Sequence, residues 1–179
     1  MQIREIDAGS EAEIDLVAQR MRDTLIEVEG PETGVALYTM DWLRDRVRWH
    51  LDPGKALAKV LLAVDAAGQI VGHTIVRRES TEAGVPFGLV STTYVVPASR
   101  RFGIAQQLLT AGEAWMHQHA LPVSATWTSS TNTPLIRLYA RNGYAQVEQH
   151  THAVTGTLMV KLEKRFDADT QPVLPTAGG

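Results

Sequence analysis

One strand-to-helix junction most constrains what this chain can fold into. It reads Val95-Val96-Pro97-Ala98-Ser99-Arg100-Arg101-Phe102-Gly103-Ile104-Ala105, a strand end, a short basic turn and a helix start. The first N–H groups of a helix lack internal acceptors and lie at the positive end of its dipole, which favours a bound phosphate. Gly103 and Ala105 are small, and Arg100 and Arg101 add positive charge. Taken alone, the segment fits a phosphate cradle and a solvated basic turn equally well.

Other phosphate-binding patterns and several other classes of protein fit the chain less well. It contains no G-x-x-x-x-G-K-[ST] loop and no G-x-G-x-x-G after the first predicted strand, which argues against nucleotide triphosphatases and dinucleotide folds. A net charge of -3 argues against a nucleic-acid binder. Cysteine is absent, so disulfides and thiolate metal sites are excluded, and no His/Asp/Glu spacing indicates a metal. Without an apolar leader or a long apolar run, we expect a cytoplasmic protein with no membrane partner.

Hydrophobic periodicity predicts an order of strand, two helices, three strands, helix, strand, helix and two strands. Ser10 and Glu13 form a capping box at the start of the first helix. The stretch from Glu27 to Asp41 reads as a long acidic loop, and Thr133-Pro134 as a helix start with Thr133 as the cap. This order indicates one α/β domain over residues 1–166 with a mixed sheet covered on both faces, followed by a disordered tail, 167–179. The remaining predicted ranges are strands 2–6, 57–65, 69–77, 85–96, 123–128, 144–150 and 155–163 and helices 41–51 and 103–119.

At this point the sequence resembles the GNAT acetyltransferase superfamily. The family signature, Gln or Arg, two residues, Gly, one residue, then Gly or Ala, is matched by Arg100, Gly103 and Ala105. The family's second segment is similar to the run from Asn132 through Leu138-Tyr139 to Gly143-Tyr144. Both motifs stand in the family's order and at its usual separation, and the predicted order of elements agrees with the family fold.

The resemblance implies a mostly antiparallel sheet of about seven strands with a V-shaped opening between the fourth and fifth. Acetyl-CoA would lie in that opening, where Tyr94, Val95 and Val96 splay from Ala125–Trp127. The amides of Arg101, Phe102, Gly103, Ile104 and Ala105 would hold the pyrophosphate, Arg100 would add charge, and Asn132 would bond the pantetheine. No metal is implied.

The resemblance also implies direct attack of an amine on the thioester in a ternary complex. A backbone N–H near Val95 or Val96 would stabilise the thioester oxygen. Tyr139 would protonate the leaving thiolate, although its spacing also fits an aromatic residue that packs beside Leu135 and Leu138. The base stays open, because residues 89–93 carry no carboxylate; the options are a water relay through Ser91 or Thr93, or one of Glu148, His150 and His152.

The acceptor is the least constrained part of the prediction. We expect N-acetylation of a primary amine on a small molecule or a peptide. The alternatives are a longer acyl-CoA donor, or a non-catalytic acyl-CoA-binding regulator of the same fold. The acidic stretch either attracts a cationic amine or is simply solvated, and Trp127 either packs in the core or walls the acceptor site. Trp49 and Trp115 are predicted to be helix core residues, His73 is predicted to be structural, and a homodimer is possible.

Overall fold

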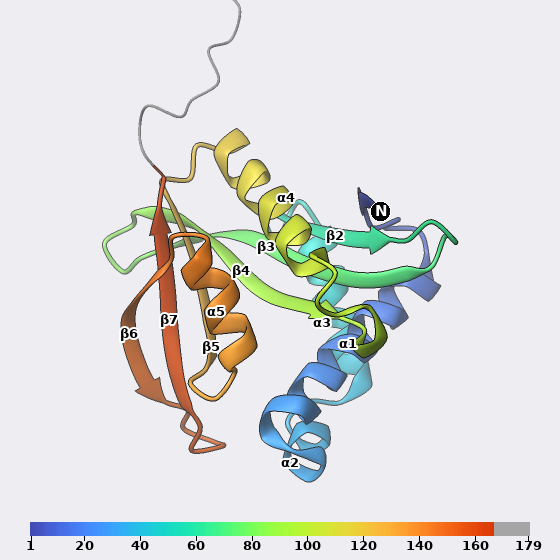
Figure 1. The fold of residues 1–179 in the computed structure, drawn as a ribbon, viewed down its shortest axis with the longest axis horizontal. Coiled ribbons are helices and arrows are strands. Elements are labelled where there is room, and N and C mark those ends of the chain that lie inside the picture. Colours follow the sequence, from blue (N-terminus) through green and yellow to red (C-terminus); the bar gives the residue numbers. More distant parts are fainter. Residues whose placement is uncertain (167–179) are drawn as a thin grey trace, which may run out of the picture.

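The structure, a computed structural model, describes residues 1–166. The tail predicted for 167–179 lies outside the described residues. Seven strands form one sheet in the order β1-β2-β3-β4-β5-β7-β6, and only β4 and β5 run parallel (Figure 1). This confirms the predicted mixed, mostly antiparallel sheet. The strands are β1 (Gln2–Glu5), β2 (Ala58–Val64), β3 (Ile70–Ser80), β4 (Pro86–Val95), β5 (Val123–Ser129), β6 (Ala145–Thr151) and β7 (Leu158–Arg165).

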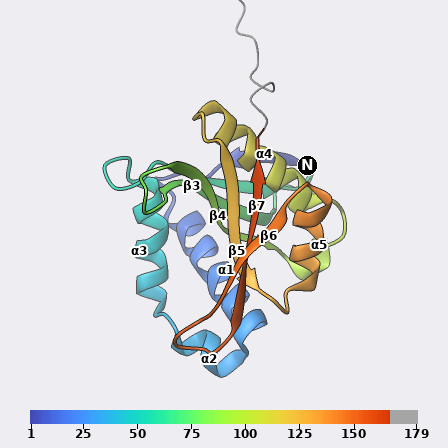
Figure 2. The same ribbon diagram turned by 90° about the vertical axis from the view of Figure 1, so that its left-hand side faces the viewer.

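Helices cover both faces of the sheet, as Figure 2 shows in a view turned by 90°. One face carries α1 (Glu11–Glu29) and α3 (Met40–Leu51), whose core includes Val17, Val47 and Leu62. The other face carries α4 (Ile104–Gln118) and α5 (Thr133–Arg141), packed over Val90 and Leu162. The two cores lie on opposite sides of β3 and β4, so both faces of these central strands are packed against helices.

The prediction of a long acidic loop between the first two helices is wrong. α1 continues to Glu29, a further short helix α2 spans Pro31–Ala36, and α3 begins at Met40. Gly30 turns the chain with a φ of 85°, and Pro31 suits the first turn of α2 because it needs no N–H acceptor there. Gly34 lets α2 pack on α1, since a Cβ atom there would stand 2.5 Å from the backbone nitrogen of Ile26.

The predicted helix starts were right in place and partly wrong in their caps. Ser10 accepts the N–H of Glu13 at 3.3 Å, as expected, but the Glu13 carboxylate bonds Arg4 and the amide of Asp7 instead of closing the box on Ser10. Asn132, not Thr133, caps α5: its side-chain oxygen accepts the amide of Leu135. Trp115 is buried as predicted, whereas Trp49 is only half-buried and was wrongly placed in the core.

Candidate active site

The sheet opens into a V between β4 and β5. The two strands pair over only three positions, Gly88 with Ser124, Leu89 with Ala125 and Val90 with Thr126. The Thr126 hydroxyl donates to the Val90 carbonyl at 2.9 Å and closes the apex of the V. Beyond the apex, β4 continues to Val95 on β3 and β5 continues to Ser129 on β7, so the two strands diverge. The predicted splay between the fourth and fifth strands is confirmed.

A β-bulge at the apex decides which backbone groups face the V. Ile75 pairs with Thr92 and Val76 with Val90, so Ser91 is the extra residue. Past the bulge, the N–H of Val96 donates to the carbonyl of Val71 at 2.9 Å. Directly opposed residues of an antiparallel pair alternate between bonded and non-bonded, so Tyr94, like Val96, turns its polar backbone groups toward β3.

The groups that face the V therefore belong to Thr93 and Val95. This corrects the predicted free edge of Tyr94 to Val96, of which only Val95 turns its N–H outward. The carbonyl of Val95 is already bonded, because it accepts the Arg100 Nε–H at 2.8 Å. The N–H of Val95 and both groups of Thr93 remain for a ligand strand.

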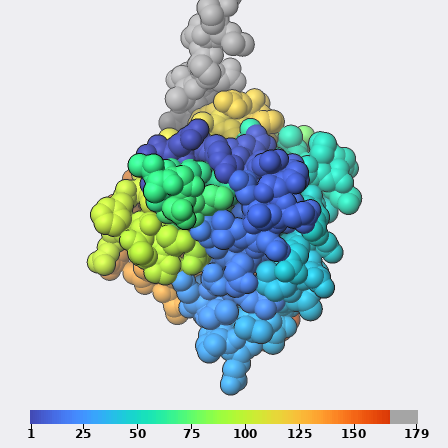
Figure 3. Space-filling view, turned by 90° about the vertical axis from the view of Figure 1, so that its right-hand side faces the viewer, coloured from blue at the N-terminus to red at the C-terminus, as the bar shows by residue number. Residues whose placement is uncertain are grey.

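The turn between β4 and α4 forms a concave run of amides. A 3-10 turn, Pro97–Ser99, is followed by two residues with positive φ, Arg101 at 68° and Gly103 at 78°. Within the part of the chain described, the amides from Arg101 to Ala105 donate to no protein acceptor. Phe102 is 76% exposed, and a Cβ atom on Gly103 would meet nothing within 4 Å. Figure 3 shows this yellow-green segment at the surface, beside the blue N-terminal helix. A run of free amides at a helix N-terminus suits an anionic ligand.

The guanidinium of Arg100 is hydrogen-bonded to other parts of the protein. Besides the Val95 carbonyl it bonds Glu27 of α1 at 2.6 Å, and its guanidinium lies 5.6 Å from the centre of the Tyr94 ring. The structure thus gives Arg100 a positioning role that ties the cradle to α1 and β4. Glu27 belongs to the acidic stretch for which attraction of an amine was one of two predicted roles, and its charge is paired with Arg100.

A cavity of about 210 Å³ fills the V. Its lining brings together predicted residues from distant parts of the chain: Thr93, Asn132, Tyr139 and His152 all contribute to it. Trp127 forms part of the wall, so of its two predicted roles the structure supports the wall. Glu29 also lines the cavity, with its carboxylate bonded to the Thr157 hydroxyl at 2.5 Å across the opening.

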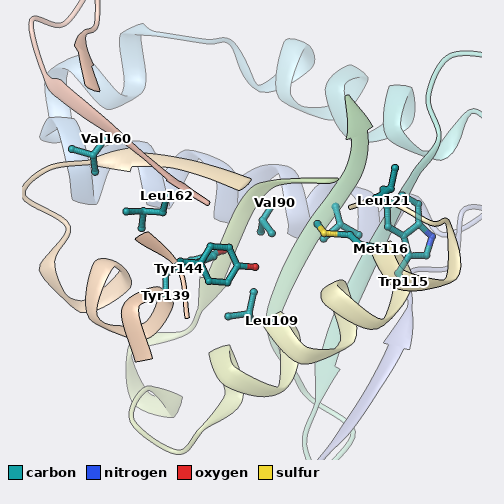
Figure 4. Close-up of a cluster of buried hydrophobic side chains, with 10 residues drawn as sticks. Val90, Leu109, Trp115, Met116, Leu121, Tyr139, Tyr144, Val160 and Leu162 are labelled. Carbon is teal, nitrogen blue, oxygen red and sulfur yellow. The ribbon is translucent and has the colours of Figure 1, made fainter. Parts of the chain in front are cut away.

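Tyr139 belongs to a cluster of buried side chains (Figure 4) and also lines the cavity. Its ring is 1% exposed and packs at right angles on the Tyr144 ring, with the centroids 4.7 Å apart. Burial raises the pKa of Tyr139 above its ordinary value, against smaller opposing effects of the Thr126 and Thr93 hydroxyls. The phenol is therefore protonated at neutral pH, as a proton donor must be.

Tyr144 provides a contrast to Tyr139. Its hydroxyl lies 2.7 Å from the Ser124 hydroxyl and 2.9 Å from Glu113, which in turn accepts Lys164 at 2.9 Å. Burial also raises the pKa of Tyr144. This buried network ties α4 to β5 and β7 and does not line the V.

The other predicted site residues divide between the cavity and the surface. The Asn132 side chain accepts from Leu135 and donates to the Thr128 hydroxyl at 3.2 Å, which leaves one N–H and one lone pair for a ligand. His152 accepts backbone amides at Nδ1, at 3.2 Å from Thr155, so its neutral form carries the proton on Nε2. Glu148 and His150 are exposed on β6 and do not line the cavity.

A second cavity, of about 300 Å³, continues from the first on the α1–α3 face of the sheet. The two share Thr24, Leu25, Tyr38, Thr92 and Trp127 among their lining residues. Two guanidinium groups line its far end, Arg46 of α3 and Arg77 of β3, together with the imidazole of His50 of α3. Sequence reasoning missed these residues, because helical and strand spacing alone do not bring α3 and β3 together.

Residues 1–166 contain no grouping of three or more His, Cys, Asp or Glu side chains suited to a metal ion. No helix in the same range is long and apolar enough to cross a membrane.

The sequence comparisons agree with this geometry. The model of the Acetyltransferase (GNAT) family matches residues 21–144. The chain is 31% identical over 90 residues to a mycothiol acetyltransferase of Arthrobacter sp. (strain FB24), a match that covers 50% of this chain and 28% of that protein. The chain thus spans under a third of that relative's length.

Solved structures share the fold over nearly the whole chain. A structure of the NatC complex bound to Gag peptide and CoA contains a chain with a TM-score of 0.73 and 15% identity, with 93% of this chain and all of that chain covered. A ribosomal-protein-alanine N-acetyltransferase from Brucella melitensis gives a TM-score of 0.69 at 18% identity, with the same coverage. With its splayed sheet and amide cradle, the chain has the architecture of an acyltransferase. It belongs to the GNAT acetyltransferase family.

Proposed function

We propose that this chain transfers an acetyl group from acetyl-CoA to a primary amine, by direct attack within a ternary complex. The observation that carries the proposal is the placement of three elements along and beside β4: a strand edge left free where β4 diverges from β5, a run of free amides directly after that strand, and a buried, protonated tyrosine that lines the cavity in the V. Coenzyme A offers a pyrophosphate, amides and a thiol in that order along its length. The protein offers a complementary group for each.

The chain's own residues would hold the donor in an extended form. The amides of Arg101, Phe102, Gly103, Ile104 and Ala105 would bind the pyrophosphate. Thr93 and Val95 would pair with the pantetheine as a sheet edge pairs with an added strand. The remaining N–H of Asn132 would bind a pantetheine carbonyl from the opposite wall. Acetyl-CoA supplies the activated acyl group.

Two residues would stabilise or neutralise the negative charges that develop in the reaction. The N–H of Val95, which faces the V, would donate to the thioester oxygen as it gains charge. Tyr139 would give its phenolic proton to the departing sulfur. Val96 cannot act as the first donor, since its N–H is bonded to Val71.

Glu29 is our candidate for the group that takes the proton from the attacking amine. Among the residues that line the V it alone carries a carboxylate. His152 is less suited, because its Nδ1 lone pair is occupied by backbone amides. We expect Glu29→Gln to lower kcat at least about a hundredfold, in the range for general base catalysis. Thr157→Val is the matched control, because it removes the hydrogen bond to Glu29 but leaves the carboxylate. An equal loss of kcat in both variants would mean that Glu29 only holds the connection between β6 and β7 in place.

The function is tested by incubating the chain with acetyl-CoA and a panel of primary amines and peptides, with thiol release and product mass as readouts. We expect stoichiometric thiol and acetylated amine with at least one class of acceptor. A longer-chain acyl-CoA that outcompetes acetyl-CoA would identify a different donor. Tight coenzyme A binding without thiol release on any amine would favour a regulator over an enzyme.

A further inference from the structure

The cavity beside the V has a basic end that the proposed chemistry does not use. Arg46 projects from α3 and Arg77 from β3, and both line the cavity. Both lie near the Trp49 ring, whose centre is 4.2 Å from the Arg46 guanidinium and 5.9 Å from that of Arg77. Two guanidinium groups at one end of a cavity repel one another, so their presence needs an electrostatic partner.

The protein supplies only part of the negative charge that would balance these two guanidinium groups. Arg77 donates from Nε to Glu79 at 2.6 Å. Among residues 1–166, no acceptor is hydrogen-bonded to the guanidinium of Arg46, and burial together with the charge of Arg77 lowers the pKa of Arg46. One carboxylate therefore faces two cations, and this corner keeps a net positive charge.

His50 fixes the geometry of the corner without adding charge. Its Nδ1 lies 2.7 Å from the Arg46 carbonyl, which can only accept, so Nδ1 carries the proton. Its Nε2 then accepts a guanidinium N–H of Arg77 at 3.2 Å. Burial lowers the pKa of His50 to about 4, so the ring is neutral at physiological pH. The two hydrogen bonds of His50 thus orient the Arg77 side chain.

We infer that Arg46 and Arg77 bind an oxyanion, a carboxylate or a phosphate, that the acceptor amine carries at its far end. The inference rests on the proposed function, since it concerns the acceptor of the same reaction. Planar guanidinium groups match the oxygens of both anions. The acceptor's amine would enter the V, and its anion would remain at the α3 end of the joined cavity.

The sheet register sets the spacing between the two ends. Arg77 pairs with Leu89 and Thr93 pairs with Thr74, which lies three residues from Arg77 along β3. The path along β4 is one residue longer only because of the bulge at Ser91. At about 3.3 Å per residue the two positions stand about 10 Å apart along the sheet, a distance that the Arg77 side chain only partly spans. The acceptor must therefore separate its amine from its anion by several bonds, so a simple α-amino acid is too short.

The test compares acceptors built on the same six-carbon chain, in steady-state acetylation by the full chain of the protein. Aminohexanoate and aminohexyl phosphate carry an oxyanion, and aminohexanol does not. We expect kcat/KM for at least one anionic amine to exceed that for the neutral amine by at least about tenfold, as a charged hydrogen bond would give. The better of the two anions distinguishes a carboxylate from a phosphate.

Variants on α3 complete the test. Arg46→Gln should remove the preference by raising KM for the anionic amine about tenfold while the neutral amine is unaffected. Arg48→Gln on the same helix is the matched control, because Arg48 pairs with Glu11 and Asp45 outside the cavity. Equal rates for charged and neutral amines in the unmodified protein would overturn the oxyanion site and leave the acetyltransferase standing. Acetylation of no amine would instead refute the proposed function.

Discussion

Removal of one hydroxyl group, in Tyr139→Phe, separates catalysis from packing. The ring of Tyr139 is 1% exposed and would keep its contacts with Tyr144 and the surrounding core. Only the phenolic oxygen is lost, which leaves the nearby hydroxyls of Thr93 and Thr126 without one neighbour. The stability cost is small, at most that of one neutral hydrogen bond, about 1 kcal/mol.

The kinetic cost of the same change is much larger if Tyr139 donates the proton. A positioned general acid contributes about a hundredfold to ten-thousandfold. That range corresponds to about 2.7–5.4 kcal/mol of activation free energy. The proposed binding determinants of acetyl-CoA lie in the cradle and on β4, so its KM should change by less than about threefold.

The assay is steady-state thiol release at saturating amine, with unfolding in urea measured in parallel. Tyr144→Phe is the matched control, because it removes a buried hydroxyl bonded to Ser124 and Glu113 outside the V. We expect this control to lose stability and to keep its kcat. A Tyr139→Phe enzyme with kcat within threefold of the unmodified protein would refute the role of Tyr139 as the acid.

Three further predictions concern the cradle, the helix cap and acid stability. Gly103→Val should weaken coenzyme A binding at least about tenfold in calorimetry, because a β-branched residue resists the φ of 78° found there and would displace the cradle amides. Asn132→Ala should lower the free energy of unfolding by about 1 kcal/mol through loss of the α5 cap, and should also weaken coenzyme A binding. Burial lowers the pKa of His73 to about 3, so the unfolded state binds the extra proton between pH 6.5 and 3 and stability falls as pH falls through that window. His73→Phe should reduce this slope by up to about 1.4 kcal/mol per pH unit in urea unfolding, with the exposed His117→Gln as control.

Local sequence signals were sufficient for most of the helices and strands. The turn proposed to bind a phosphate consists of a few consecutive residues, so it could be picked out directly, and the positive φ at Gly103 agrees with the choice of glycine. The mixed sheet and its opening between the fourth and fifth strands followed from the family resemblance. The element that was missed, α2, lies in a polar stretch whose helix depends on packing of Gly34 against α1.

Features that depend on pairing across the chain could not be predicted. The side of β4 that faces the V is set by the bulge at Ser91, which a period of two cannot locate. The partner of Arg100 is Glu27, 73 residues away. The two arginines at the end of the second cavity likewise meet only once α3 and β3 have folded together, and nothing in the local sequence of Arg46 or Arg77 indicates that they do.

Hydrogen–deuterium exchange with and without coenzyme A tests whether coenzyme A lies in the V between β4 and β5. Amides without an acceptor exchange quickly, and a ligand that bonds them slows the exchange. We expect protection at 101–105 and at Thr93 and Val95, with no change at Val96, whose N–H is already bonded to Val71. Binding of coenzyme A with protection elsewhere, and none in the cradle or on this edge of β4, would contradict it.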